Sequence, residues 1–237
     1  MPTRPGPPPT HARFVTALAL AAVTLAVATF AAGGASAQTA YLKVTGDPLD
    51  STRYADHKGS PYRFEEDLPG FVSEADGARV RVAALNYNGF TEEFEIVRGD
   101  GAHIALNPAN YTSVYVIQAG DTLEFERGLR PRHPEKFLRA VYRGPDVSLF
   151  EAFTVSESEV VVQNVGAPET FLRFAPKSLY FLSRGDGKLE LVSLRRKPFL
   201  KALADASNAG ELAGVWKRAG GDGEARAAAV LAAYRVD

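Results

Sequence analysis

Apolar and polar residues alternate along much of the chain beyond residue 76, with the period of two that is typical of half-buried β-strands. In residues 78–82 the apolar side chains alternate with arginines, and in residues 93–96 they alternate with glutamates. Other segments have the composition of strands, at residues 111–117, 122–126, 137–142, 147–155, 160–163, 170–174, 179–182 and 188–194. The pattern predicts roughly ten short strands, with little helix between them.

Turn dipeptides separate several of these segments. Asp76-Gly77, Asn88-Gly89 and Asp100-Gly101 follow one another at twelve-residue steps, and Ala119-Gly120 and residues 184–187 mark two further reversals. Each Asx-Gly pair can adopt the positive φ angles that a two-residue hairpin turn requires. We therefore predict a mainly β fold, in which an antiparallel meander forms a sandwich or a barrel-like sheet.

The C-terminal part of the chain changes to a helical period. Apolar residues recur there at three- and four-residue steps, namely Phe199, Leu200, Leu203, Leu212, Val215, Trp216, Ala227, Val230, Leu231 and Tyr234. Asn208 with Glu211 is a candidate capping box, Asp222 is a candidate N-cap, and Gly220-Gly221 separates two elements. We expect two or three short helices that pack against an open end or face of the sheet.

The N-terminus has the pattern of a secretory leader. Arg4, His11 and Arg13 precede an uninterrupted apolar run at residues 14–32, and Ala35 and Ala37 supply the small residues that signal peptidase needs. The pattern predicts a signal peptide cleaved after Ala37. The run is 19 residues long, so an uncleaved membrane anchor is the alternative.

Four regions follow from these patterns. Residues 1–37 are the predicted signal peptide, and residues 38–68 an extended lead-in that is interrupted by Asp47-Pro48, residues 59–61 and residues 68–70. Residues 69–194 are the antiparallel β domain, and residues 195–237 the helical C-terminal segment. After cleavage we expect no transmembrane span.

Composition limits the classes of partner and site. The chain has no cysteine, which excludes disulfides, thiolate metal sites and a lipidated N-terminal cysteine. The formal net charge is −1, and removal of Arg4 and Arg13 with the leader makes it −3. This acidic balance argues against nucleic acid as a partner.

The three glutamates of residues 84–96 are the first candidates for catalysis. Glu93 and Glu95 lie two apart on a predicted strand, so they share a face with a rise of about 7 Å between them, which falls within the spacing of an inverting glycosidase pair. A catalytic acid also needs an apolar pocket, whereas these side chains point away from the face of Phe94 and Ile96. We therefore interpret Glu92, Glu93 and Glu95 as the solvated face of a hairpin.

Other motifs favour equally plain interpretations. His57, His103 and His133 stand in no catalytic or zinc-binding spacing, and we expect them at the surface. Arg98-Gly99-Asp100 and Arg184-Gly185-Asp186 spell an adhesion tripeptide, but the following glycine explains each as a turn. We assign no catalytic, cofactor-binding or metal-binding residue.

Two surface features remain candidates for binding. The loop at residues 127–136 contains Arg127, Arg130, Arg132, His133 and Lys136 and could contact an anionic lipid or glycan, although a solvated loop explains it as well. Aromatic residues gather in the first half of the chain, and they favour core and rim positions over a carbohydrate or peptide groove; they are Tyr54, Tyr62, Phe64, Tyr87, Phe90, Tyr111 and Tyr115.

Short motifs resemble a family of exported proteins of unknown function from Gram-negative bacteria of the Bacteroidota lineage and their relatives. The motifs are residues 59–62 (Gly-Ser-Pro-Tyr), residues 68–70, and residues 85–88 (Leu-Asn-Tyr-Asn) leading into residues 92–95. The family also ends in a helical tail, like residues 198–234 here. This chain departs from it at Arg63, where Leu is usual, at Asn86, where Arg is usual, and in its alanine-rich tail. The resemblance implies a periplasmic or cell-surface location and a shared architecture.

Three functions agree with these observations. The first is a non-catalytic binding or structural module of the bacterial envelope, whose sheet face or edge engages another envelope protein or a polysaccharide. The second is a secreted hydrolase that acts on glycan or peptide through carboxylates. The third is a lipid carrier inside a β-barrel, which needs an interior lined by apolar side chains.

Overall fold

The structure, a computed structural model, describes residues 46–50, 52–163, 168–185 and 187–236. The chain divides into two units, Met1–Gly33 and Gly34–Asp237, and all of the described residues belong to the second. The predicted leader, with its cleavage point after Ala37, lies outside the described residues.

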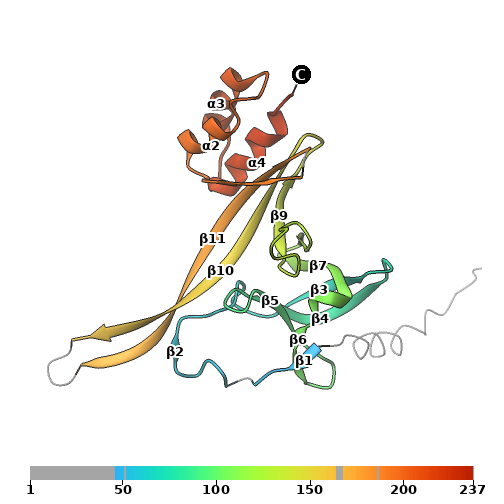
Figure 1. Ribbon diagram of the computed structural model, residues 1–237, viewed down its shortest axis with the longest axis vertical. Helices are drawn as coiled ribbons and strands as arrows, with labels where there is room; N and C mark the ends of the chain where they lie inside the picture. The colour runs from blue at the N-terminus through green and yellow to red at the C-terminus, as the bar shows by residue number, and fades with distance from the viewer. Residues whose placement is uncertain (1–45, 51, 164–167, 186, 237) are drawn as a thin grey trace, which may run out of the picture. The chain divides into compact units, whose positions relative to one another are not determined.

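One 12-stranded sheet forms the body of the protein, and the predicted mainly β, antiparallel fold is confirmed (Figure 1). Its spatial order is β1-β6-β5-β4-β3-β7-β8-β9-β10-β11-β12, and β2 pairs with β11. Among the described strands, no pairing joins β1 to β12, so the sheet is open. The strands are β1 (Gly46–Pro48), β2 (His57–Lys58), β3 (Leu68–Glu74), β4 (Arg79–Asn88), β5 (Glu93–Val97), β6 (His103–Leu106), β7 (Tyr111–Gln118), β8 (Asp121–Glu126), β9 (Leu138–Arg143), β10 (Val147–Val162), β11 (Glu169–Arg184) and β12 (Leu189–Val192).

Three short C-terminal helices follow the sheet, as predicted: α2 (Arg196–Ala202), α3 (Ala209–Arg218) and α4 (Gly223–Ala233). Asp222 caps α4 by accepting a hydrogen bond from the backbone N–H of Ala225 at 2.9 Å. The capping box predicted at Asn208 and Glu211 is wrong, because the Asn208 side chain donates instead to the carbonyl of Ala233 at 2.7 Å. That bond ties the start of α3 to the end of α4.

The hairpin turns agree with the sequence at two of the three Asx-Gly pairs. Gly77 and Gly101 have φ angles of 86° and 84° and join β3 to β4 and β5 to β6. The two-residue turn predicted at Asn88-Gly89 is wrong, because β4 continues through Asn88 and the connection to β5 spans residues 89–92. There Glu92, and not Gly89, takes the left-handed conformation, with φ of 57°.

Strands β10 and β11 are each 16 residues long and pair along their whole length, whereas the sequence predicted two shorter strands in place of each. Pro176 lies within β11, opposite Val155, whose N–H donates to the Gly89 carbonyl on the side away from β11. Facing residues in an antiparallel ladder orient their N–H groups alike. Pro176 therefore removes an N–H that would point out of the β10–β11 ladder, so the ladder tolerates it.

The lead-in is more ordered than predicted. It contributes β1 and β2, and its backbone bonds to the end of β4 and the residue after it, since Arg63 donates to Tyr87 and Pro61 accepts from Gly89. Residues 68–70, predicted to break any element, instead begin β3, which lies between β4 and β7 in the sheet. A register shift between Leu68 and Gly70 accommodates the proline.

Two main apolar clusters form the core. One joins strands β3 to β8 and includes Phe64, Tyr87 and Tyr111, which confirms that these three aromatic residues are core residues. The other joins the helices to the sheet, around Phe199 and Trp216. In the part of the chain that the structure describes, no helix has both the length and the apolar character needed to cross a membrane.

Gly70 offers a test of the close packing in the centre of the sheet. A Cβ atom added there would lie 2.1 Å from the backbone oxygen of Tyr115 and 2.8 Å from the side chain of Leu85. Because backbone cannot easily move in a central strand, we expect Gly70→Ala to lower the free energy of unfolding by about 2 to 3 kcal/mol in urea titrations. A Cβ atom on Gly185 meets nothing within 4 Å, so Gly185→Ala should stay within about 0.5 kcal/mol of the native protein. Equal stability of the two variants would contradict the close approach.

Candidate functional site

Glu95 is buried, and its predicted exposure to solvent is wrong. Its side chain is 1% exposed and lies 2.5 Å from the Arg53 guanidinium. Asn88 donates to one carboxylate oxygen at 2.6 Å and Tyr62 to the other at 2.9 Å. The Nε2 atom of His103 lies 3.4 Å away. We call these five residues the Glu95 cluster.

The Glu95 cluster joins the lead-in to the sheet. Arg53 and Tyr62 come from the lead-in, whereas Asn88, Glu95 and His103 come from β4, β5 and β6. Burial and then the charge of Glu95 raise the pKa of Tyr62 to about 12, which keeps its hydroxyl a donor. Burial lowers the pKa of Arg53, but its hydrogen bond and attraction to Glu95 outweigh burial and leave that pKa raised. The cluster therefore clamps residues 53–62 against the strands.

The three glutamates of the β4–β5 hairpin do not act as one group. Glu92 lies in the turn, 3.6 Å from Arg130 and 3.8 Å from Lys136. Glu93 is half-buried at the start of β5. Hydrogen-bond donors surround Glu95, in place of the apolar walls that a catalytic acid requires.

A second buried cluster holds the helices to the sheet. Glu151 of β10 is 2% exposed and pairs with Arg139 of β9 at 2.6 Å and with Arg63 of the lead-in at 2.7 Å. Arg139 also pairs with Glu224 of α4 at 2.6 Å. Burial alone would raise the pKa of Glu151, but the two guanidinium groups outweigh burial and hold that pKa below its ordinary value. We call Arg63, Arg139, Glu151 and Glu224 the Glu151 cluster.

The sequence analysis did not predict the ion pairs of the Glu151 cluster. One signal was present, because Glu151 interrupts the otherwise apolar and small residues 147–155. A carboxylate in such a run is either exposed by the pleat or buried with partners. The partners of Glu151, which are Arg139, Ser178 and Arg63, lie 12, 27 and 88 positions away along the chain, so only the fold reveals them.

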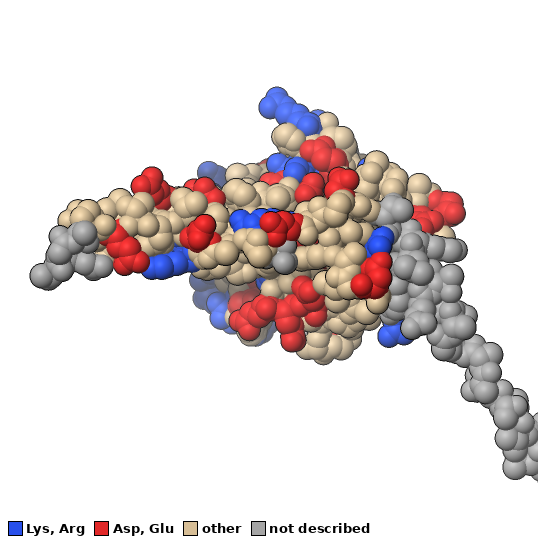
Figure 2. All heavy atoms as spheres, turned by 90° about the horizontal axis from the view of Figure 1, so that it is seen from below, with Lys and Arg blue, Asp and Glu red and all other residues tan. Residues whose placement is uncertain are grey.

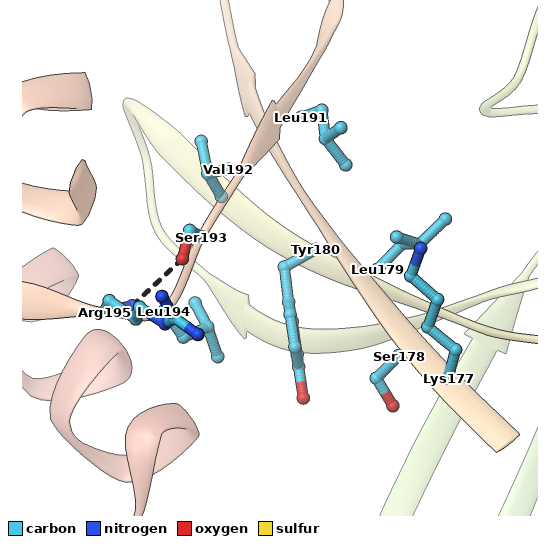
Figure 3. A pocket seen from close by; sticks show the side chains of 9 residues that line it. All are labelled: Lys177, Ser178, Leu179, Tyr180, Leu191, Val192, Ser193, Leu194 and Arg195. Carbon is cyan, nitrogen blue, oxygen red and sulfur yellow. Dashed lines mark hydrogen bonds between the residues drawn. The ribbon is translucent and has the colours of Figure 1, made fainter.

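A groove of about 580 Å³ lies beside this cluster, between β11 and the segment that joins β12 to α2 (Figure 3). Two of its polar side chains are engaged in the interior, since Ser178 donates to Glu151 at 2.5 Å and Tyr180 to Glu224 at 2.8 Å. The backbone N–H of Arg195 donates to the Ser193 hydroxyl at 3.3 Å on the opposite side. The lining residues are Lys177, Ser178, Leu179, Tyr180, Leu191, Val192, Ser193, Leu194 and Arg195.

The histidines lie apart from one another. The side chain of His57 is only 11% exposed and lies 2.6 Å from Glu157, so its predicted surface position is wrong. His103 belongs to the Glu95 cluster, and His133 is exposed beside Glu135. Among the described residues, no group of three or more His, Asp or Glu side chains is arranged to hold a metal ion.

The tripeptide and loop motifs have local partners. Arg98 pairs with Asp100 within the β5–β6 turn, as a turn interpretation predicts. Arg184 ends β11 and pairs with Glu190 of β12 at 2.8 Å, whereas Asp186 lies outside the described residues. In the basic loop, Arg130 and Lys136 face Glu92, which offsets part of the loop's positive charge.

The distal halves of β10 and β11 extend beyond the pairing of β10 with β9. Strand β9 pairs with β10 only over residues 148–151, so residues 156–162 of β10 and 169–175 of β11 continue as a two-stranded ribbon (Figure 1). We call this ribbon the arm. Val161 and Val162 are 53% and 38% exposed on it. An isolated two-stranded hairpin is only marginally stable, so the arm needs support.

That support comes from β2 of the lead-in, on the β11 side of the arm. The His57 ring stacks on Phe174 at 4.5 Å, and Lys58 lies 3.5 Å from the Phe171 ring centroid. Residues 57 and 58 pair with residues 172 and 173 of β11 in parallel. The β10 side of the arm has no such cover among the described residues.

The backbone direction of β10 shows which groups face the uncovered side. Val147 accepts from Gly144 at 3.0 Å and Val155 donates to Gly89 at 2.8 Å, both on the side away from β11. Because orientation alternates along a strand, the N–H and C=O groups of Glu157, Glu159 and Val161 also face away from β11. We call these three residues the open edge of β10.

Comparison of the chain with protein-family models, curated proteins and solved structures finds no match. The functional argument therefore depends on the geometry of this chain.

The Glu95 cluster predicts that substitutions of Glu93 and Glu95 change the free energy of unfolding by different amounts. Glu95→Gln should lower the free energy of unfolding by roughly 3 kcal/mol, because Arg53 then keeps a partly buried charge without an ionised partner. Glu93→Gln is the matched control, and at a half-exposed position it should cost less than about 0.5 kcal/mol. Chemical denaturation of the two variants measures both values. A similar small loss for both would show that Glu95 does not clamp the lead-in.

Proposed function

We propose that this protein is an exported, non-catalytic binding module of the bacterial envelope, and that it binds another envelope protein through the open edge of β10. The observation that carries the proposal is the row of outward-facing backbone groups at Glu157, Glu159 and Val161, next to exposed valines. An uncovered strand edge is a template for pairing with another chain. Addition of a partner strand to such an edge is a common mode of protein recognition.

Export is supported by the leader pattern of residues 1–37. The periplasm or the cell surface is the location that this pattern and the family resemblance favour. A protein partner is favoured over a polysaccharide, because the open edge offers N–H and C=O groups at the spacing of a β-strand.

The leader predicts a defined mature N-terminus. When the full chain is expressed in a Gram-negative host, the periplasmic protein should begin at Gln38, as measured by intact mass. Replacing both Ala35 and Ala37 by leucine should retain the leader, because signal peptidase needs small residues at these positions. Recovery of the native chain with its leader in the membrane fraction would favour the anchor instead.

A hydrolase is the second candidate, and the observation that favours it is that Glu95 contacts three ionisable groups, those of Tyr62, His103 and Arg53, although it lacks the apolar walls of a catalytic acid. The Glu92→Gln, Glu93→Gln and Glu95→Gln proteins, assayed on chromogenic glycosides and peptides, separate the two candidates. Activity that one substitution removes, in a variant that is still folded, would establish the hydrolase and overturn the binding module. A lipid carrier of the kind considered above needs a barrel interior, and the open sheet does not enclose one.

The open edge is tested by a proline that removes one outward N–H. Val161→Pro should leave the β10–β11 ladder intact, because the Val161 N–H faces away from β11, as Pro176 illustrates on the opposite strand. Val161→Ala is the matched control, since it removes the same apolar side chain and keeps the N–H. A photo-crosslinking residue at Val162 reports contact in intact cells.

We expect one or a few specific cross-links to envelope proteins from the native and Val161→Ala chains. Val161→Pro should reduce them at least tenfold, which corresponds to the loss of about one or two backbone hydrogen bonds. Cross-links that persist equally in Val161→Pro, or that are absent from all three chains, would contradict binding through this edge.

A further inference from the structure

The side chains of the open edge carry a charge pattern that constrains its partner. Successive strand residues point to opposite faces, so Glu157, Glu159 and Val161 share one face, and Ser156, Ser158, Val160 and Val162 share the other. All but Val160 are exposed. The open-edge residues therefore present two carboxylates and one valine on one face of β10, whereas the residues on the opposite face of the strand are uncharged.

Glu157 and Glu159 differ in whether they have an ion-pair partner. Glu157 lies 2.6 Å from His57, which supports the arm. Glu159 is exposed and has no ion-pair partner among the described residues. Figure 2 shows both acidic and basic side chains along the arm where it extends from the rest of the protein. The unpaired charge of Glu159 is thus available to a strand on the open edge.

An added antiparallel strand meets these side chains directly. Residues that face each other across a hydrogen-bonded pair lie about 5.5 Å apart at Cα, and opposite charges at such pairs attract whereas like charges repel. The formal charge of −3 on the chain without its leader adds to this preference. A basic strand is therefore favoured.

A second copy of this chain fits the edge poorly. Antiparallel pairing of two open edges centred on the arm brings Glu159 opposite Glu159, or Glu157 opposite Glu159. Only registers displaced toward Val161 and Val162 avoid this repulsion, and these pair fewer residues. Charge in the middle of an edge strand is a common device against self-pairing.

The opposite edge of the arm does not compete for the same strand. On β11, β2 covers residues 172 and 173, and β12 covers residues 180–183. Between them Pro176 lacks the N–H that an added strand would need. The arm thus offers one pairing edge, on β10.

We infer that the open edge of β10 binds an extended strand that carries Lys or Arg opposite Glu159 and an apolar residue opposite Val161. This inference rests on the proposed function and specifies the chemistry of the partner. It predicts recognition by the alternation of basic and apolar residues, and not by basic charge alone.

Defined peptides test the pattern on the purified mature protein. The probes are an octapeptide of alternating Lys and Val, its Glu and Val counterpart, and a Lys and Val peptide of the same composition that a central proline interrupts. We expect fluorescence anisotropy to show binding of the alternating Lys and Val peptide, and at least tenfold weaker binding of the other two. Amide exchange should slow at residues 157, 159 and 161, and not at their even-numbered neighbours.

Two protein variants separate charge from fold. Glu159→Lys should weaken binding of the Lys and Val peptide about tenfold and strengthen binding of the Glu and Val peptide, because a repulsion replaces an attraction. Ser158→Lys, the control, places the new charge on the other face and should change either affinity by less than about threefold. Both substitutions are at exposed positions, and circular dichroism checks that each variant is folded.

The outcomes distinguish this inference from the proposed function. Equal binding of the Lys and Val and the Glu and Val peptides, or no response to Glu159→Lys, overturns the basic strand. If the cellular cross-links still depend on the Val161 N–H, the proposed binding module is supported even though the basic partner strand is not. A dimer that light scattering detects in the native chain, and that Val161→Pro abolishes, would overturn the basic strand in favour of a second copy.

Discussion

The buried Glu151 carboxylate is the interaction on which the arrangement of the sheet, the lead-in and the helices depends. It receives Arg63 from the lead-in, Arg139 from β9 and Ser178 from β11, and Arg139 extends the contact to Glu224 of α4. Breaking a buried ion pair by removing one partner is far more costly than forming it is favourable. The cluster therefore acts less as a source of stability than as a constraint, because any other placement of these segments leaves a charge buried without a partner.

The Glu95 cluster applies a second constraint of the same kind to the lead-in. Arg53 and Tyr62 reach the same carboxylate from the lead-in, while residues 57 and 58 lie between them along the chain and pair with β11. A chain that is held at residues 53, 62 and 63 has little freedom between those points. This explains how β2, a strand of two residues, can support the arm.

Much of the fold could be predicted because it depends on local periodicity. Alternating residues indicated the strands, the Gly-containing pairs indicated the turns at Gly77 and Gly101, and Asp222 marked the start of α4. The burial of Glu95 could not be predicted from alternation, because the polar face of a strand is exposed to solvent only when no other segment covers it. Here the lead-in covers it, and the lead-in has no periodicity of its own. The lengths of β10 and β11 were missed because residues 156–159 and 175–178, which are polar or contain a proline, interrupt the apolar pattern of the segments on either side.

The arm combines features that restrict pairing with one edge that permits it. Lead-in strand β2, strand β12 and Pro176 restrict the β11 side, and Glu157 and Glu159 oppose self-pairing on the β10 side. One more proline or a bulge within residues 156–162 would prevent the arm from pairing with any further strand, and other proteins protect their edge strands in this way. Neither is present, and the N–H groups at Glu157, Glu159 and Val161 still face outward. An edge that resists its own copy yet retains its backbone donors and acceptors is suited to a partner of different charge.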